Sequence, residues 1–311
     1  MIVYSASLGN DVAKIDALTA TERDEMYDDL LRKVQLFHFE LLKEFRRTCE
    51  LIGAKYILDS GTLLGAVRHQ GFIPWDDDVD VGMLRKEYDV FLREAPQILK
   101  EGFYLRAPET DSDYGESYAK LCVASGKYLN VESDLPFDCS GITLDVFPYD
   151  AFPVDQRKQR IQGKLCDRYK RLLRRKAKYS RYVPPKGLFQ RTYYAVHFFC
   201  RRCETSFISR DELLKRLRTA QTLYNGEPSG LVFESGGARA FKYGAWVVPE
   251  SCLRETTELT FEGEKFSCPV DYDAYLKATF GDYMKLPPEN ERAPKHDAVN
   301  RIFGIVEDRQ K

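Results

Sequence analysis

The sequence has 311 residues, of which 43% are hydrophobic and 31% are charged, a balance typical of globular proteins and not of disordered ones. Its net charge of −1 excludes a global attraction to nucleic acid or membranes, so any such attraction must be local. We expect no signal peptide and no transmembrane helix from its hydropathy pattern. The eight cysteines are dispersed, which without an export signal indicates reduced thiols and a cytoplasmic protein.

The first predicted element is a long helix. Residues 1–18 are predicted to be a flexible N-terminal arm, and a single catalytic domain is expected to cover 19–311. Thr19 with Glu22 resembles a capping box, which marks the start of the helix. Apolar residues then recur at three- and four-residue steps until Gly53, which is expected to end the helix.

Short strands follow, separated by clusters of Gly, Pro, Asp and Ser. They are, in chain order, Tyr56–Leu58, Val79–Met83, Phe103–Leu105, Tyr118–Val123, Ile142–Phe147, Trp246–Val248, Leu259–Phe261 and Lys265–Cys268. A short helix is predicted after the first strand, and further helices at Arg85–Leu99 and Tyr272–Phe280. This order predicts an α+β fold with a mixed sheet flanked by helices.

A change of composition predicts a basic helical insertion at about residues 154–224. From Arg157 to Arg181 the chain has twelve Lys or Arg residues and one acidic residue. Such a run is either a solvated helix face or a peripheral contact with an anionic membrane. No nucleic-acid motif accompanies it, so we expect no nucleic-acid partner. His197, Cys200 and Cys203 have a spacing that zinc could use, but a single CxxC makes zinc the less favoured interpretation.

Four carboxylates gather where a buried strand is predicted to begin, at Asp76, Asp77, Asp78 and Asp80. On a strand, Asp78 and Asp80 would point to the same face. Asp145 lies in another apolar strand, where an ionised carboxylate is costly unless it is paired or binds a metal. These patterns predict a Mg²⁺ or Mn²⁺ site formed by Asp78, Asp80 and Asp145. The alternatives are a solvated acidic turn and, for Asp145, an ion pair with a basic residue.

Other polar residues near these carboxylates are candidates for binding a phosphorylated substrate. The turn that opens the short helix could hold phosphate with its backbone N–H groups, although Ser and Thr at such places are commonly helix caps. Lys120 lies within a strand, where it either neutralises phosphate or pairs with Asp145. The residues predicted to bind substrate or nucleotide are Ser60, Gly61, Thr62, Arg68, His69, Asp76, Asp77, Lys120 and His296.

Three segments closely resemble one family, the LicD-type phosphocholine transferases, which also include fukutin-like proteins. They read LDSGTLLGAVRHQGFIPWDDDVDVGM, ITLDVFPYD and YLKATFGDYMKLPPENERAPKHD. The resemblance implies a nucleotidyltransferase-like fold similar to that of polymerase-β-type enzymes. In that fold, Asp78 and Asp80 would form the Asp-x-Asp pair and Asp145 would be the third acid.

The resemblance also implies a reaction. A phosphorylated small alcohol, typically phosphocholine, would pass from a CDP-linked donor such as CDP-choline to a glycan hydroxyl, with CMP leaving and Asp145 as general base. The acceptor would be a cell-surface glycan or its lipid-linked precursor, such as those of teichoic acid, lipopolysaccharide or capsule. The protein would be cytoplasmic and would bind such a precursor peripherally, at the inner face of the membrane. The alternatives are a nucleotidyltransferase that leaves a nucleotide on its acceptor, and a non-catalytic glycan or membrane-surface adaptor.

Overall fold

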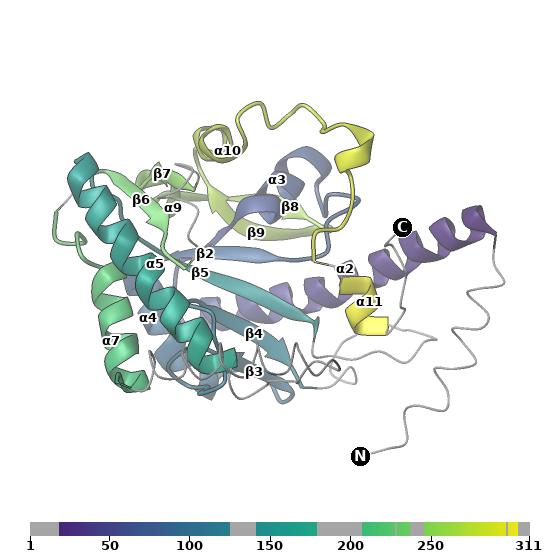
Figure 1. Ribbon diagram of the computed structural model, residues 1–311. Helices are drawn as coiled ribbons and strands as arrows, with labels where there is room; N and C mark the ends of the chain where they lie inside the picture. Colours follow the sequence, from purple (N-terminus) through teal and green to yellow (C-terminus); the bar gives the residue numbers. More distant parts are fainter. Residues whose placement is uncertain are drawn as a thin grey trace, which may run out of the picture.

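The computed structural model describes residues 19–124, 141–178, 207–227, 229–236, 246–296 and 298–303. Its main feature is a seven-stranded mixed sheet, in which five strands follow the order β1-β2-β5-β4-β3 (Figure 1). The other two strands continue the sheet beside the second half of β5, where β6 pairs with β5 and β7 pairs with β6. The strands are β1 (Ile57–Leu58), β2 (Asp80–Leu84), β3 (Phe103–Arg106), β4 (Ala119–Val123), β5 (Thr143–Ala151), β6 (Leu231–Glu234) and β7 (Val247–Pro249). The predicted α+β class and mixed sheet are confirmed.

A separate hairpin joins β8 (Thr256–Phe261) to β9 (Glu264–Pro269). Glu262 and Gly263 form its turn, both with positive φ, as a two-residue hairpin turn requires. The sequence predicted this turn.

Helices pack around the sheet (Figure 1). They are α2 (Ala20–Ile52), α3 (Ser60–His69), α4 (Arg85–Glu94), α5 (Gln156–Lys178), α7 (Arg210–Gln221), α9 (Ser251–Arg254), α10 (Tyr272–Phe280) and α11 (Ala298–Phe303), with 3₁₀ turns at Ala95–Gln97 and Glu289–Glu291. The capping box of α2 is present, and Gly53 ends the helix in a left-handed conformation. The helix predicted to reach Leu99 is wrong at its end, because Pro96 cannot continue the α-helical hydrogen bonding.

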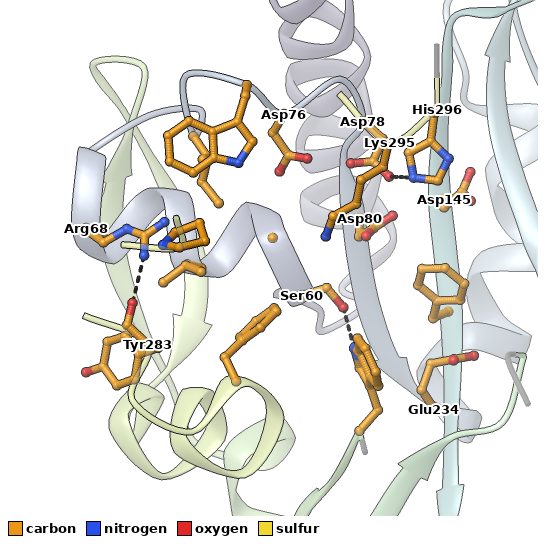
Figure 2. A pocket seen from close by; sticks show the side chains of 18 of the residues that line it. Ser60, Arg68, Asp76, Asp78, Asp80, Asp145, Glu234, Tyr283, Lys295 and His296 are labelled. Carbon is orange, nitrogen blue, oxygen red and sulfur yellow. Dashed lines mark hydrogen bonds and ion pairs between the residues drawn. The ribbon is translucent and has the colours of Figure 1, made fainter. Parts of the chain in front are cut away.

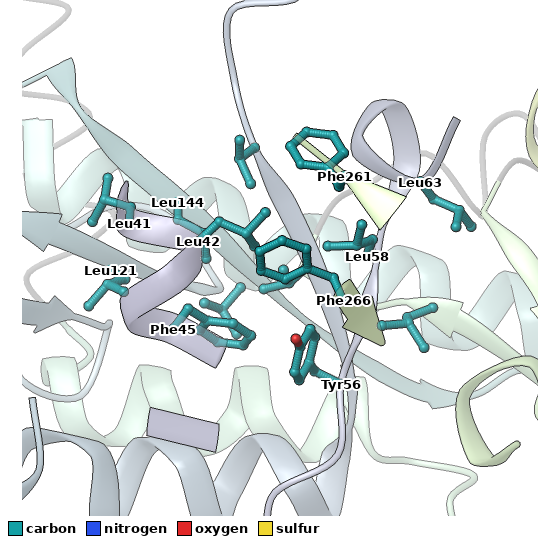
Figure 3. Close-up of a cluster of buried hydrophobic side chains, with 14 of the residues drawn as sticks. Leu41, Leu42, Phe45, Tyr56, Leu58, Leu63, Leu121, Leu144, Phe261 and Phe266 are labelled. Carbon is teal, nitrogen blue, oxygen red and sulfur yellow. The ribbon is translucent and has the colours of Figure 1, made fainter. Parts of the chain in front are cut away.

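The hydrophobic core lies between α2 and one face of the sheet (Figure 3). Leu41, Leu42 and Phe45 of α2 are fully buried there, together with Leu144 of β5. Along β5 the buried and partly exposed positions alternate, so Leu144 faces the core while Asp145 faces the other side. The opposite face of the sheet is therefore free to carry polar side chains.

The strand register aligns three charged residues in one row across this second face. β2 runs parallel to β5 with Asp80 opposite Asp145, and β4 runs antiparallel to β5 with Lys120 opposite the same Asp145. Residues that the sequence separates by 65 positions thus become direct neighbours. The row is set by strand pairing and not by loops.

The predicted insertion contains α5 and α7, which lie side by side at one edge of the sheet (Figure 1). They pack through Leu173, Leu213 and Leu217, a small cluster separate from the main core. His197, Cys200, Cys203 and the arm 1–18 lie outside the described residues. Among the described helices, none has both the length and the apolarity needed to cross a membrane.

Candidate active site

A cavity of about 720 Å³ lies on the polar face of the sheet (Figure 2). The start of α3 and the loop before β2 form one wall, β5 forms another, and residues 280–288 and 295–296 contribute a third. Many residues of the predicted site line it together, namely Ser60, Gly61, Arg68, Asp76, Asp78, Asp80, Asp145 and His296. The fold therefore brings together residues from across most of the described chain.

The carboxylates of this cavity repel one another. Burial raises the pKa of Asp80 well above its usual value, and the charges of Asp78 and Asp145 raise it further. Burial and the neighbouring Asp78 likewise raise the pKa of Asp76. A Cβ on Gly61 would lie 2.7 Å from an oxygen of Asp76, so only glycine lets this carboxylate approach the start of α3. Crowded hard-oxygen donors of this kind fit Mg²⁺ or Mn²⁺.

His296 adds an imidazole to the acidic wall. Its Nε2 lies 2.8 Å from Oδ2 of Asp78. Burial alone would raise the pKa of Asp78, but the hydrogen bond and charge of His296 outweigh it and lower that pKa. The same hydrogen bond raises the pKa of His296 above its usual value, against the effect of its partial burial. The pair thus favours a charged imidazolium next to a carboxylate.

Asp77 differs from its acidic neighbours because it is 1% exposed and does not line the cavity. Its oxygens accept hydrogen bonds from the backbone N–H groups of Lys295 (3.2 Å), His296 (3.2 Å) and Ala298 (2.9 Å). Oxygen and nitrogen atoms of Asp77, Asp78 and His296 lie within 4.8 Å of one another, close enough to share an ion. The contacts of Asp77 fix the C-terminal segment, and the structure places Asp77 behind the cavity lining and not in it.

Thr62 and Lys120 also position the acidic row without lining the cavity. The N–H of Asp80 donates to Oγ1 of Thr62 at 2.9 Å, which ties β2 to α3. Nζ of Lys120 lies 2.5 Å from Oδ1 of Asp145. For Lys120 the ion pair was the alternative left open by the sequence. For Thr62 the structure shows a contact with the backbone of Asp80.

Arg68 lines the cavity, whereas the adjacent His69 does not. Arg68 donates to the backbone carbonyl of Tyr283 at 2.8 Å, which holds residues 281–288 against α3 (Figure 2). Nε of Arg68 lies 3.5 Å from Nδ1 of His69. His69 therefore lies beside Arg68, and it does not line the cavity in which we predicted that it would bind substrate.

Asp59 was not among the predicted site residues, and it is fully buried directly before α3. Its carboxylate accepts hydrogen bonds from the hydroxyls of Tyr149 (3.0 Å) and Tyr275. Burial raises the pKa of Asp59, although both tyrosine hydrogen bonds oppose this. Ser60 follows with φ of 48°, a left-handed conformation that costs a non-glycine residue about 1–3 kcal/mol. An Asp after a buried strand was the available signal for this anchor.

These features define an α+β protein with an acidic, cation-attracting cavity on one face of its sheet. Residues 53–151 match the family model described as "LicD/FKTN/FKRP, nucleotidyltransferase domain", which confirms the predicted resemblance to this family. The acidic residues Asp78, Asp80 and Asp145 all lie within the matched range.

Individual relatives agree with this assignment. The chain is 29% identical over 278 residues to the lipopolysaccharide cholinephosphotransferase LicD of Haemophilus influenzae, which covers 86% of this chain and 96% of the relative. It is also 56% identical over 34 residues to the ribitol 5-phosphate transferase FKRP of human and of mouse, covering 11% of this chain and 7% of either relative.

Proposed function

We propose that the protein is a metal-dependent transferase that moves a phosphorylated small alcohol, most often phosphocholine, from a CDP-linked donor to a glycan hydroxyl and releases CMP. The similarity to a cholinephosphotransferase along 86% of the chain carries this proposal. The acceptor would be a cell-surface glycan or its lipid-linked precursor. We further propose that residues 19–311 form one nucleotidyltransferase-like domain with an insertion at 154–224.

We assign three roles to residues of the cavity: metal binding, acceptance of a proton and binding of the donor phosphates. Asp78, Asp80 and Asp145 would hold Mg²⁺ or Mn²⁺, which when bound would neutralise the donor diphosphate and acidify the attacking hydroxyl. Asp145, whose Oδ1 lies 2.5 Å from Nζ of Lys120, would accept the proton of the acceptor hydroxyl.

Two basic groups of the cavity would bind the phosphates of the donor. Arg68 lines the cavity on the side away from β5, and Lys295 lines it beside Asp78 and Asp80 (Figure 2). Their positive charges would offset negative charge that develops as the phosphoryl group is transferred.

A donor panel tests the reaction. CDP-choline, CDP-ethanolamine, CDP-glycerol and CDP-ribitol are offered with Mg²⁺ and with lipopolysaccharide or teichoic acid, and CMP is measured. We expect CMP from at least one donor, with CDP-choline the fastest, and none in EDTA. Pyrophosphate release from a nucleoside triphosphate would support the nucleotidyltransferase alternative instead. Release of no CMP from any donor would contradict the proposal.

We also propose that α5 contacts an anionic membrane surface. Its exposed residues Arg157, Arg160, Lys164, Arg168 and Arg171 are spaced three or four positions apart, so they form one stripe along the helix. Arg174, one turn further on, lines the cavity and pairs with Glu116 at 2.8 Å. A membrane bound along this stripe would therefore bring a lipid-linked acceptor toward the cavity.

Charge reversal of Arg160, Lys164 and Arg168 to Glu is expected to weaken binding to phosphatidylglycerol vesicles about 100-fold, since each basic group contributes about 1 kcal/mol near an anionic surface. Binding is measured by co-sedimentation, with phosphatidylcholine vesicles as the neutral comparison. Turnover of a soluble acceptor should be unchanged, because these side chains lie outside the cavity lining.

The matched control reverses three exposed basic residues elsewhere, Lys86, Arg93 and Lys277. An equal loss of vesicle binding in both triple variants would show that only net charge matters and would contradict a specific role of α5. High salt should remove the difference between the wild-type protein and the α5 variant.

A further inference from the structure

One end of the cavity is aromatic and acidic, unlike the end that holds Arg68. Phe147 lies two residues after Asp145 on β5, so both side chains point to the same face, about 7 Å apart along the strand. Trp246 and Glu234 also line the cavity, and Glu234 lies below Asp80 and Asp145 in Figure 2. The distance along β5 is comparable to the length of an extended phosphocholine group.

Trp246 is held in an uncommon conformation. Its indole N–H donates to Oγ of Ser60 at 2.7 Å, and its ring meets that of Phe280 edge-on at 6.3 Å between centroids. The φ of Trp246 is 59° and that of Ser60 is 48°, so both partners of this hydrogen bond are non-glycine residues in the left-handed region. Such backbone conformations persist only where the surroundings impose them, and they concentrate at ligand sites.

The carboxylate of Glu234 is held deep in this end, where the residue is 7% exposed. A Cβ on Gly236 would lie 2.8 Å from Oε1 of Glu234 and 2.9 Å from Cβ of Tyr118, so glycine permits this close packing. Lys170 of α5 is also buried and its charge acts on Glu234, which explains how an acidic group is tolerated there. Glu234 thus lines the cavity as a buried residue, and the positive charge of Lys170 of α5 acts on it.

We propose that Phe147, Trp246 and Glu234 form the subsite for the quaternary ammonium group of the transferred alcohol. A quaternary ammonium donates no classical hydrogen bond, so aromatic faces and a nearby carboxylate suit it, whereas a polyol needs hydrogen-bonding partners. The subsite rests on the proposed function for its place next to the phosphates. It makes the protein selective for a choline-type donor over a ribitol-type donor.

Tetramethylammonium chloride is the direct probe of the subsite, because its binding requires neither a donor nor turnover. We expect it to bind the wild-type protein in calorimetry at constant chloride concentration. Trp246→Leu and Glu234→Gln should each weaken this binding about tenfold, while Trp246→Phe should retain most of it. Ribitol in place of tetramethylammonium should show no dependence on these residues.

The matched control is Trp75→Leu, which removes the other tryptophan of the cavity, one that lies against Arg292 at 5.6 Å. It is expected to leave tetramethylammonium binding unchanged. Equal weakening by Trp75→Leu and Trp246→Leu, or no binding to the wild-type protein, would overturn the subsite. Glu234→Gln preserves the shape of the side chain. If Trp246→Leu does not fold, the loss of tetramethylammonium binding is therefore tested with Glu234→Gln.

Donor preference separates this subsite from the reaction itself. In Trp246→Leu and Glu234→Gln, the ratio of kcat/KM for CDP-choline to that for CDP-ribitol should fall, whereas in Trp246→Phe it should stay close to that of the wild-type protein. Turnover of CDP-choline with an unchanged ratio in Glu234→Gln would overturn the subsite and leave the transferase intact. Tetramethylammonium bound at Trp246 in a protein that consumes no CDP-alcohol would support the subsite and overturn the transferase.

Discussion

Asp80→Asn is expected to lower Mg²⁺-dependent release of CMP by at least about 100-fold, which corresponds to about 2.7 kcal/mol of lost transition-state stabilisation. Asp80 lies at the start of β2, opposite Asp145, in the row of charges that faces the cavity. The amide of Asn keeps the size of the side chain but removes a charge that would hold the metal. The measurement is the initial rate of CMP release at saturating CDP-choline.

The same substitution should not weaken the fold. Without metal, the charges of Asp78 and Asp145 repel the carboxylate of Asp80. Burial is the largest cause of the raised pKa of Asp80, and this repulsion is the next. Removing the charge relieves that repulsion, so the free energy of unfolding in EDTA should be unchanged or higher. Mg²⁺ should then raise the Tm of the wild-type protein, which binds it in the native state, and raise that of the variant less.

Asp113→Asn is the matched control, because Asp113 is exposed and lies outside the cavity lining. It should change neither CMP release nor the effect of Mg²⁺ on the Tm. Full activity in Asp80→Asn, or an identical effect of Mg²⁺ on both variants, would show that the acidic row is not the metal site.

The elements that the sequence predicted well are those determined by neighbouring residues. The helix α2 was bounded from Thr19 and Gly53 because capping acts within one turn of the chain. The turn of the β8–β9 hairpin was found because Glu262 and Gly263 separate two strand-like runs by the two residues that a tight hairpin turn uses. Asp78, Asp80 and Asp145 could each be singled out because strand periodicity and the cost of a buried charge are local arguments, whereas their gathering depends on the pairing of β2 with β5.

The contacts that the sequence analysis missed link distant residues. Asp59 is bound by Tyr149 and Tyr275, which lie 90 and 216 positions further along the chain. β6, at Leu231–Glu234, is a short apolar run that becomes a strand only because the end of β5 offers it an edge. Neither relation leaves a periodic pattern, so the cavity wall at Glu234 and Trp246 could not be derived from sequence.

A buried ion pair at the far end of β5 is another such contact. Arg85, the first residue of α4, donates through Nε to Oδ1 of Asp150 at 2.9 Å and through Nη2 to Oγ of Ser235 at 3.0 Å. The side chain of Asp150 is 0% exposed, and it also accepts from Asn225 at 2.7 Å. The network joins β5 and α4 to β6 and to the end of the α5–α7 region, so its loss affects several parts of the fold.

Arg85→Leu is therefore expected to lower the free energy of unfolding by about 3–5 kcal/mol, because it leaves the Asp150 carboxylate buried without its cation. The measurement is urea unfolding followed by circular dichroism in EDTA. Arg93→Leu on the same helix is the control and should cost at most about 1 kcal/mol, since Arg93 is 65% exposed and pairs with a surface Glu94. Arg85→Leu combined with Asp150→Leu should recover part of the loss, because no unpaired charge then remains buried. Similar losses in Arg85→Leu and Arg93→Leu would mean that the pair does not hold the α5–α7 region to the sheet.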